Sequence, residues 1–214
     1  MIALIDYRAG NLTSVRKALA EVGAEVSIPM QPHALASADG VIVPGVGHFG
    51  ATRALDQPWV DAVRSCLRDG RPLLGICLGM QWLYERSEES PELCGLGVFE
   101  GACTRLTGRV SSTSDLALQD VKVPHVGWNT LALSSRAGET WIATGVPQDS
   151  QVYFTHSYVA PVTAESVAVT THGDAFAAIV ERGSVAGVQF HPEKSGQVGL
   201  QILRNFVARA AAVH

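Results

Sequence analysis

A cysteine between two glycines is the first feature of the sequence that could do chemistry. Cys77 lies in the segment GICLG, with Gly75 and Gly79 on either side, after an apolar run and before a helical pattern. This arrangement is typical of a nucleophile elbow, a tight strand-to-helix turn in which neighbouring side chains would clash. The free N–H groups of a helix start favour negative charge, so we expect them to stabilise the reactive thiolate. The alternative is a buried cysteine that packs as a small hydrophobic side chain.

A cysteine nucleophile needs a base, and the segment FHPEKS offers one. His191 precedes Pro192, which favours an extended backbone at the histidine. Residues two apart in an extended segment point to the same side, so we expect the Glu193 carboxylate beside the imidazole. Such a pair suits a base that is oriented by an acid. The alternative is a surface His-Pro-Glu turn.

A glycine-rich loop follows a third apolar run, in the segment VPGVGHFG. Gly45 and Gly47 free the backbone to present N–H groups, which could hold the oxyanion of a tetrahedral intermediate. A plain turn is the alternative. Ligands of open α/β sheets bind beyond the carboxyl ends of the strands, and we expect this loop, Cys77 and His191 at such ends.

Alternating strand and helix patterns in the first half of the chain predict parallel βαβ units. Continuous apolar runs indicate buried strands, and apolar residues at helical spacing followed by glycine indicate helices. The expected strands are 2–7, 24–28, 40–45 and 72–76, and the expected helices are 11–22, 58–69 and 78–86.

Short strand-like runs fill the second half, before a final helix over 196–213. The runs are 97–106, 125–133, 151–160, 166–172, 175–180 and 185–190. Residues 182–184 predict a hairpin turn, and the Ser- and Thr-rich segment 107–120 predicts a loop. The expected fold is one α/β domain over residues 1–214, with a mixed, mostly parallel central sheet flanked by helices.

Composition narrows the function classes. The chain has 214 residues, of which 47% are hydrophobic, and a formal net charge of −4, so nothing favours a nucleic acid or an anionic membrane as partner. No apolar stretch is long enough to cross a bilayer, and the N-terminus does not read as a signal peptide. Four cysteines without a C-x-x-C pair indicate a reduced, cytoplasmic protein. The seven histidines are dispersed, so we expect no metal and no cofactor.

The segments GICLGMQ and FHPEKS resemble the signature of the class I glutamine amidotransferases, and the resemblance covers essentially the whole chain. Within that class the chain is similar to the glutaminase subunit of imidazole glycerol phosphate synthase, an enzyme of histidine biosynthesis. The segments that carry this similarity are IDYRAGNL, PGVGHFG, CLGMQ, HVGWN, THSY and FHPEKS. Arg8 departs from the family's usual form, which has a small residue after the tyrosine.

The resemblance implies a role for each member of a catalytic triad. Cys77 would attack the side-chain amide of glutamine, His191 would take its proton and then protonate departing ammonia, and Glu193 would orient His191. Water would hydrolyse the resulting thioester to glutamate. The substrate-binding residues that the resemblance implies are Gly47, Leu78, Gln81 and Ser157.

The resemblance also implies a heterodimer with a (β/α)8-barrel cyclase subunit. Ammonia would pass through the barrel to a phosphoribosyl-bearing substrate, and the products would be imidazole glycerol phosphate and an aminoimidazole carboxamide ribotide. Trp128, in HVGWN, and Lys194 are candidates for the interface. The alternatives are a core aromatic side chain for Trp128 and a solvated charge for Lys194.

Two other functions remain open. Anthranilate, aminodeoxychorismate and GMP synthases use similar glutaminases, but these typically resemble CLGHQ and FHPES, so Met80 and Lys194 favour the histidine pathway. Redox-sensing or chaperone-like proteins with an elbow cysteine form a second class. Those proteins need no downstream His-Pro-Glu, so the complete Cys-His-Glu set argues against them.

The glycine loop suggests a switch. Val46 lies between Gly45 and Gly47, so a peptide flip there is sterically cheap. We hypothesise that the resting loop aims a carbonyl at the oxyanion position and that activation turns an N–H toward it. One missing oxyanion donor lowers the rate by roughly 10²- to 10³-fold, which is enough for a switch.

Overall fold

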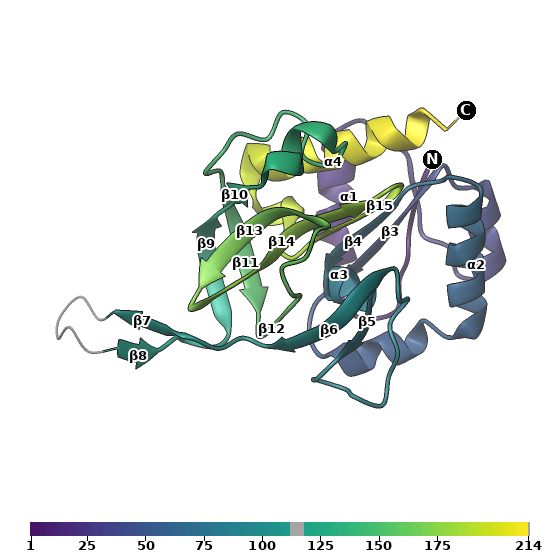
Figure 1. Ribbon diagram of the computed structural model, residues 1–214. Helices are drawn as coiled ribbons and strands as arrows, with labels where there is room; N and C mark the ends of the chain where they lie inside the picture. Colours follow the sequence, from purple (N-terminus) through teal and green to yellow (C-terminus); the bar gives the residue numbers. More distant parts are fainter. Residues whose placement is uncertain (112–117, 214) are drawn as a thin grey trace.

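A mixed eight-stranded sheet forms the centre of the protein, whose computed structural model describes residues 1–111 and 118–213 (Figure 1). Its strands are β1 (Ile2–Leu4), β2 (Val26–Ser27), β3 (Gly40–Gly45), β4 (Leu73–Cys77), β10 (Ala132–Leu133), β13 (Ser166–His172), β14 (Asp174–Arg182) and β15 (Val185–Val188). Their order is β10-β13-β14-β15-β4-β3-β1-β2. The run from β15 to β2 is parallel, and the other pairs are antiparallel. The predicted mixed, mostly parallel sheet is confirmed.

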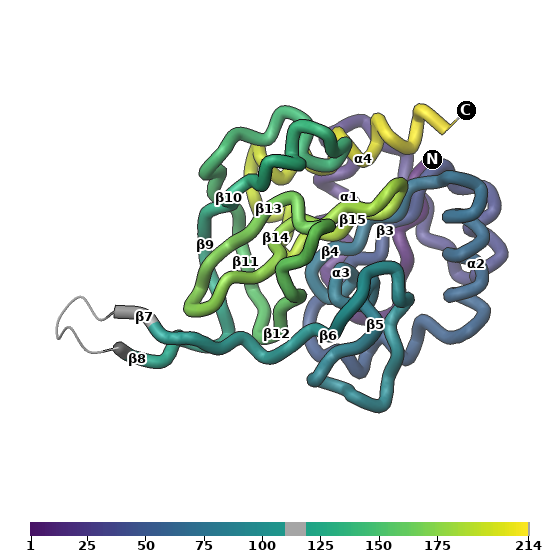
Figure 2. Tube along the Cα trace, viewed as in Figure 1, coloured from purple at the N-terminus to yellow at the C-terminus, as the bar shows by residue number. Residues whose placement is uncertain are grey.

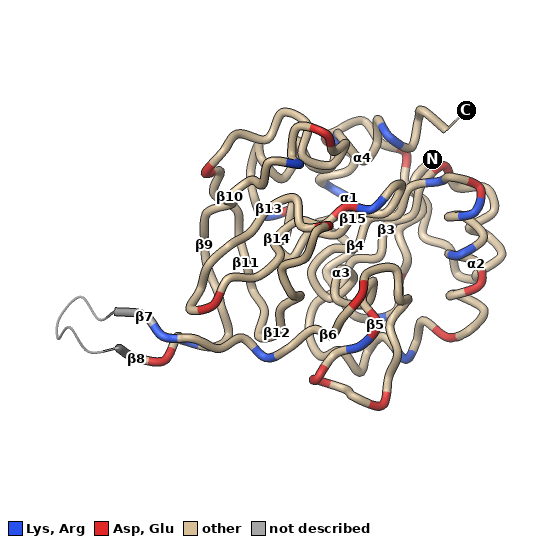
Figure 3. The backbone as a smooth tube through the Cα atoms, in the orientation of Figure 1, with Lys and Arg blue, Asp and Glu red and all other residues tan. Residues whose placement is uncertain are grey.

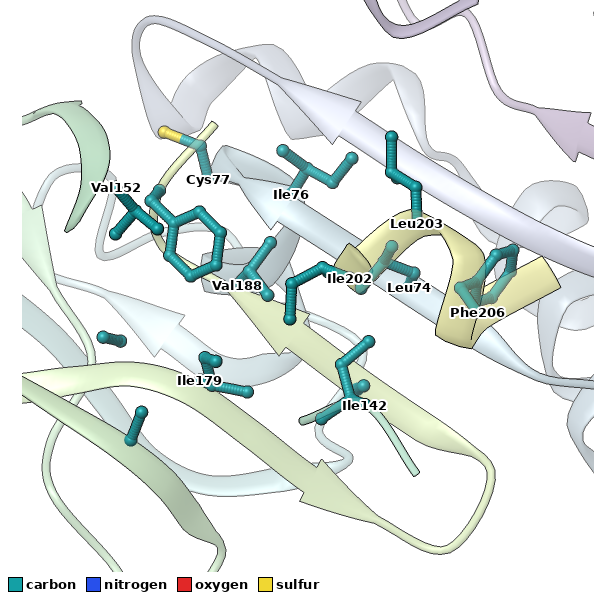
Figure 4. Packing of buried hydrophobic residues seen from close by; sticks show 14 of the residues in the cluster. Leu74, Ile76, Cys77, Ile142, Val152, Ile179, Val188, Ile202, Leu203 and Phe206 are labelled. Carbon is teal, nitrogen blue, oxygen red and sulfur yellow. The ribbon is translucent and has the colours of Figure 1, made fainter. Parts of the chain in front are cut away.

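Within the described residues, four α-helices cover the two faces of this sheet: α1 (Leu12–Glu21), α2 (Gln57–Arg68), α3 (Leu78–Trp82) and α4 (Gly196–Ala211). Side chains of α1 and α4 join one hydrophobic cluster, and side chains of α2 and α3 join the other. Because side chains alternate along a strand, β4 supplies Leu74 and Ile76 to the first cluster and Leu73 to the second. Figure 4 shows Leu74 and Ile76 beside Leu203 and Phe206 of α4, with Cys77 at the edge of the packed region.

Charge is kept out of the centre of the sheet. Strands β3, β4 and β15 carry no charged residue, and the charged positions lie on the helices, the loops and other strands (Figure 3). Such continuous apolar strands are typical of parallel sheets that are buried on both faces. Among the described helices, none combines the length and the apolar character needed to cross a membrane.

Smaller sheets flank the central one. They contain β5 (Tyr84–Ser87), β6 (Phe99–Arg105) and β12 (Tyr158–Val159), then β9 (His125–Thr130) with β11 (Gln151–His156), and β7 (Arg109–Ser111) with β8 (Leu118–Asp120). The β7–β8 pair projects away from the rest of the chain (Figure 2). Short 3-10 segments cover η1 (Pro32–Ser37), η2 (Phe49–Ala54), η3 (Ser135–Glu139) and η4 (Pro192–Lys194).

Two expectations about these elements are wrong. The helix expected over 78–86 ends at Trp82, because Tyr84–Ser87 leave it to form β5 and pair in parallel with β6. The loop expected over 107–120 contains the antiparallel strands β7 and β8 in its described part, and residues 112–117 lie outside the described residues. The run of Ser and Thr lies mostly outside the described residues, and the two strands precede and follow it in the sequence.

Candidate active site

Cys77 lies at the carboxyl end of β4, where the chain turns into α3. Its backbone has φ 52° and ψ −106°, a conformation that residues with a side chain rarely adopt. A Cβ at Gly75 would lie 2.6 Å from the carbonyl oxygen of Gly79, and a Cβ at Gly79 would overlap the carbonyl of Val43. Both flanking glycines are therefore required by packing, as expected for a nucleophile elbow.

The sulfur of Cys77 faces polar groups, although the residue is only 3% exposed. Its Sγ lies 3.8 Å from the carbonyl oxygen of Thr155 and accepts a hydrogen bond from Nε2 of Gln189 at 3.6 Å. Cys66 and Cys103 also place their sulfur near a backbone carbonyl, so the side-chain amide of Gln189 is the partner that distinguishes Cys77. The surroundings therefore favour the reactive interpretation.

His191 and Glu193 make the expected contact, with 2.8 Å between Nδ1 and Oε1, and both side chains are buried. The route to this contact differs from the prediction. His191 is extended, at φ −97° and ψ 100°, but residues 192–194 then form the 3-10 segment η4. The turn, rather than continued extended backbone, brings the carboxylate back to the imidazole.

The backbone around His191 is fixed from two sides. Its N–H donates to the carbonyl of Tyr153 on β11 at 2.9 Å. The hydroxyl of Ser195 donates to the carbonyl of His191 at 2.6 Å and accepts from the N–H of Tyr153 at 3.0 Å. These hydrogen bonds fix the backbone of residue 191, and therefore the point from which its imidazole extends.

The pKa of His191 depends on both of its predicted partners, Cys77 and Glu193. Burial lowers the pKa of His191, but the Cys77 thiolate and the Glu193 carboxylate outweigh burial and raise it to about 10. Within the described part of the chain, Nε2 of His191 is buried and has no hydrogen-bond partner of ordinary geometry. Because Nδ1 faces Glu193, Nε2 is the nitrogen left to face Cys77, whose influence on the pKa of His191 shows that the two side chains interact.

A cavity of about 240 Å³ opens beside Cys77. It is lined by Gly47, Cys77, Leu78, Gln81, Glu89, Pro124, Thr155, His156, Ser157 and Tyr158. All four residues expected to bind substrate therefore lie around one space with the cysteine. Sequence reasoning missed Glu89, Pro124 and His156, which come from separate loops and from a strand end.

Comparison with known proteins identifies the kind of site. The family model for class I glutamine amidotransferases matches residues 3–210. The imidazole glycerol phosphate synthase subunit HisH of Gloeobacter violaceus is 45% identical over 218 residues, covering 99% of this chain and 90% of that relative. The chain belongs to the HisH group of class I glutamine amidotransferases.

Further similarities agree with this membership. The HisH subunit of Thermosynechococcus vestitus is 44% identical to this amidotransferase over 212 residues, covering 97% of this chain and 96% of that relative. A crystal structure of a glutamine amidotransferase has a TM-score of 0.71 to this chain, covering 99% of this chain and all of that one. Its sequence is only 20% identical, so this likeness supports the fold.

In this amidotransferase Gln81 is tied to the nucleophile. Its Nε2 donates to the carbonyl of Tyr158 at 2.9 Å and to Oε1 of Gln189 at 3.2 Å. Gln189 in turn donates to the sulfur of Cys77. Sequence reasoning missed Gln189, although a lone polar residue in the apolar run VAGVQF is a signal that could have found it.

The glycine loop of the amidotransferase is held by the N-terminal segment. The N–H of Val46 donates to the carbonyl of Ala9 at 3.0 Å, so it is not free to serve an oxyanion. Gly47 has φ +97°, a conformation that favours glycine. The engaged Val46 N–H agrees with the hypothesised resting loop, whereas the direction of the loop carbonyl and of the Gly47 N–H stays a prediction.

The two interface candidates lie together on the surface. Trp128 on β9 is 57% exposed, so it is not a core aromatic side chain. Its ring meets the edge of Tyr153 with centroids 6.0 Å apart, and Nζ of Lys194 lies 5.6 Å from the centroid of the same tyrosine. Val126, also on β9, is 57% exposed. We call Val126, Trp128, Tyr153 and Lys194 the β9 patch.

No group of three or more His, Cys, Asp or Glu side chains within the described ranges is placed to hold a metal ion. All four cysteines of this amidotransferase are free thiols. The expectation of a site that uses neither metal nor cofactor stays a prediction.

Proposed function

We propose that this amidotransferase hydrolyses L-glutamine to glutamate and ammonia as the glutaminase subunit of imidazole glycerol phosphate synthase. The observation that carries the proposal is the buried His191–Glu193 pair, coupled to a cysteine on a strained elbow. The proposed partner is a (β/α)8-barrel cyclase subunit that consumes the ammonia to make imidazole glycerol phosphate and an aminoimidazole carboxamide ribotide.

The proposed reaction has two halves. Nε2 of His191 first takes the proton of the Cys77 thiol, and the resulting thiolate attacks the amide carbon of glutamine. The tetrahedral intermediate collapses to a thioester, and His191 gives its proton to the departing ammonia. Water, deprotonated by His191, then attacks the thioester, releases glutamate and restores the thiol. The raised pKa of His191 suits an imidazolium that is held between two negative groups.

The cavity suits a free amino acid. Gly47, Leu78, Gln81 and Ser157 all line it, and their backbone groups together with the Gln81 side chain are the contacts that we propose for the substrate. Glu89 adds a carboxylate, which accepts from the N–H of Phe49 at 2.6 Å and could face the ammonium group of glutamine. We propose Gly47, Leu78, Gln81 and Ser157 as substrate-binding residues on this basis.

The β9 patch supports the proposed partner. An exposed tryptophan beside a tyrosine is typical of an interface hot spot, and Val126 and Lys194 extend the patch around them. Docking there would place the barrel next to the strand pair β9–β11, whose far end borders the cavity. Release of the Val46 N–H from Ala9 is our proposed response of the glycine loop.

We further propose that residues 1–214 form one amidotransferase domain that works in the cytoplasm without metal or cofactor. Two observations support this. Both hydrophobic clusters lie against faces of the same central sheet, and the four free cysteines suit a reducing compartment.

Glutamine hydrolysis by the purified chain tests the proposal, first alone and then with the cyclase subunit and its ligand. We expect the partner and its ligand to raise glutamate release, and Cys77→Ala to abolish it. Cys94→Ala is the matched control, because Cys94 is exposed and lies outside the cavity. If another synthase stimulated glutamate release and the cyclase did not, the chain would be the glutaminase component of a different amidotransferase. Equal activity of Cys77→Ala and the intact chain would overturn the proposed chemistry.

A further inference from the structure

Two buried histidines lie opposite one another on β9 and β11. His125 and His156 are paired in the strand register, with 3.2 Å between Nδ1 of His125 and Nε2 of His156. They are 4% and 7% exposed. His156 also lines the cavity beside Cys77, so the pair extends from the site to strand β9.

The partners of this pair fix its protons. The carbonyl of Tyr158 can only accept, so Nδ1 of His156, 3.1 Å away, carries a hydrogen and Nε2 accepts. Nδ1 of His125 must then donate to that Nε2. Nε2 of His125 accepts from Nδ2 of Asn129 at 3.2 Å. All four ring nitrogens are satisfied with both rings neutral.

The orientation of Asn129 is fixed independently. Its Oδ1 accepts from the N–H of Thr130 at 2.8 Å, and its Nδ2 also donates to the carbonyl of Thr171 on β13 at 3.1 Å. The amide therefore presents a donor, not an acceptor, to His125. This end of the chain of hydrogen bonds is anchored to the central sheet.

The other end reaches the nucleophile. The Tyr158 carbonyl that accepts from His156 also accepts from Gln81. Gln81 donates to Gln189, which donates to the sulfur of Cys77. One continuous set of hydrogen bonds thus joins β9, which carries the exposed Trp128, to the elbow.

Packing keeps the histidines neutral. Burial is the main cause that lowers the pKa of His156 to about 3 and that of His125 to about 4, and neighbouring histidines lower both further. The ring of His125 stacks on His172 with centroids 4.1 Å apart, and His156 meets the edge of Phe176. Neutral rings are what the assigned donors and acceptors require.

We propose that His156 is a positioning residue for glutamine hydrolysis, which holds the Tyr158 carbonyl and through it Gln81, and which connects both to the surface strand β9. The proposal rests on the glutaminase function proposed above. A partner that shifts β9 when it docks would move the wall of the cavity through existing hydrogen bonds. Effector and substrate sites would then be joined by a contiguous network of defined direction.

Two substitutions of His156 test its hydrogen bonds to Tyr158 and to His125 separately. His156→Asn keeps an N–H donor for Tyr158 but loses the acceptor for His125, and His156→Leu loses both. With the cyclase subunit and its ligand bound, we expect His156→Leu to raise the KM for glutamine roughly three- to tenfold, the effect of one lost hydrogen bond. We expect His156→Asn to keep KM within about twofold but to lower stimulation by the partner roughly three- to tenfold. His33→Asn, at an exposed position, is the matched control.

A spectroscopic measurement tests the network without activity. Long-range ¹H–¹⁵N spectra of the intact chain should show both His125 and His156 as neutral rings with hydrogen on Nδ1. Hydrogen on Nε2 of His156 would overturn the inference, and so would unchanged KM and stimulation in a folded His156→Leu variant. Failure of the intact chain to hydrolyse glutamine with any partner would instead overturn the proposed function, and the spectra would then decide the network separately.

Discussion

A single methyl group at Gly75 should test the elbow. In Gly75→Ala the new Cβ would lie 2.6 Å from the carbonyl oxygen of Gly79 and 2.7 Å from the backbone nitrogen of Met80. Ordinary contact begins at about 3.4 Å, so the start of α3 must move by roughly 0.8 Å away from β4. Cys77 sits between these two elements and would be displaced with them.

Both activity and stability should respond. A displacement of about 1 Å at a reacting group lowers the rate by roughly 10²-fold, and we expect a loss of this size in glutaminase activity of the complex. Overpacking should lower the free energy of unfolding by about 1–3 kcal/mol, measured by chemical denaturation. Gly138→Ala is the control, because no atom lies within 4 Å of its added Cβ. If Gly75→Ala retained full activity, the elbow would not position the nucleophile as we describe.

Three further predictions concern the triad, the buried histidines and the surface. Glu193→Gln should lower kcat by about 10²- to 10⁴-fold and lower the pKa of His191, seen by NMR, because the orienting charge is lost; an unchanged pKa would contradict this. In the folded protein His156 stays neutral until the pH falls to its pKa of about 3, whereas in the unfolded chain the same side chain takes up a proton near pH 6.5. Between pH 7 and pH 5 the free energy of unfolding of the intact chain should therefore fall by about 2 kcal/mol because of His156. Chemical denaturation of His156→Asn should lack this part of the fall, and an equal fall in both chains would refute the prediction. Trp128→Ala should weaken partner binding by about 2 kcal/mol or more in calorimetry while the isolated chain stays folded; unchanged affinity would remove the β9 patch from the interface.

The core of the fold could be predicted because its signals are local. Apolar runs such as GVIVPG and PLLGI allow little besides buried strands, and both are strands in the structure. The end of α3 could not be predicted in the same way. Trp82 and Tyr84 are both fully buried, and the choice of strand over helix at Tyr84 depends on its pairing with Phe99, a partner fifteen residues away that local propensity does not report.

In the candidate site, too, the residues with a local sequence signal could be predicted and those that depend on distant contacts could not. The pattern GICLG was enough to predict the elbow, because a tight strand-to-helix turn needs small residues around the nucleophile. The structure agrees, since Cys77 has a positive φ and a Cβ at Gly75 or Gly79 would clash with backbone atoms. The contact between His191 and Glu193 was expected for the wrong backbone reason, because a 3-10 turn can bring together residues two apart as well as a strand can. Gln189 and His156 were missed because their roles depend on hydrogen bonds between strands that are distant in the chain.

The most direct measurement is the identity of the residue that carries the acyl group during turnover. Acid quenching of the complex with glutamine, followed by proteolysis and mass spectrometry, should find a glutamyl thioester on the peptide that contains Cys77. The adduct should be lost in Cys77→Ala and should form more slowly when His191 is replaced, because His191 takes the thiol proton before acylation. Glutamate release without any adduct on Cys77, or an adduct on a different residue, would contradict the account.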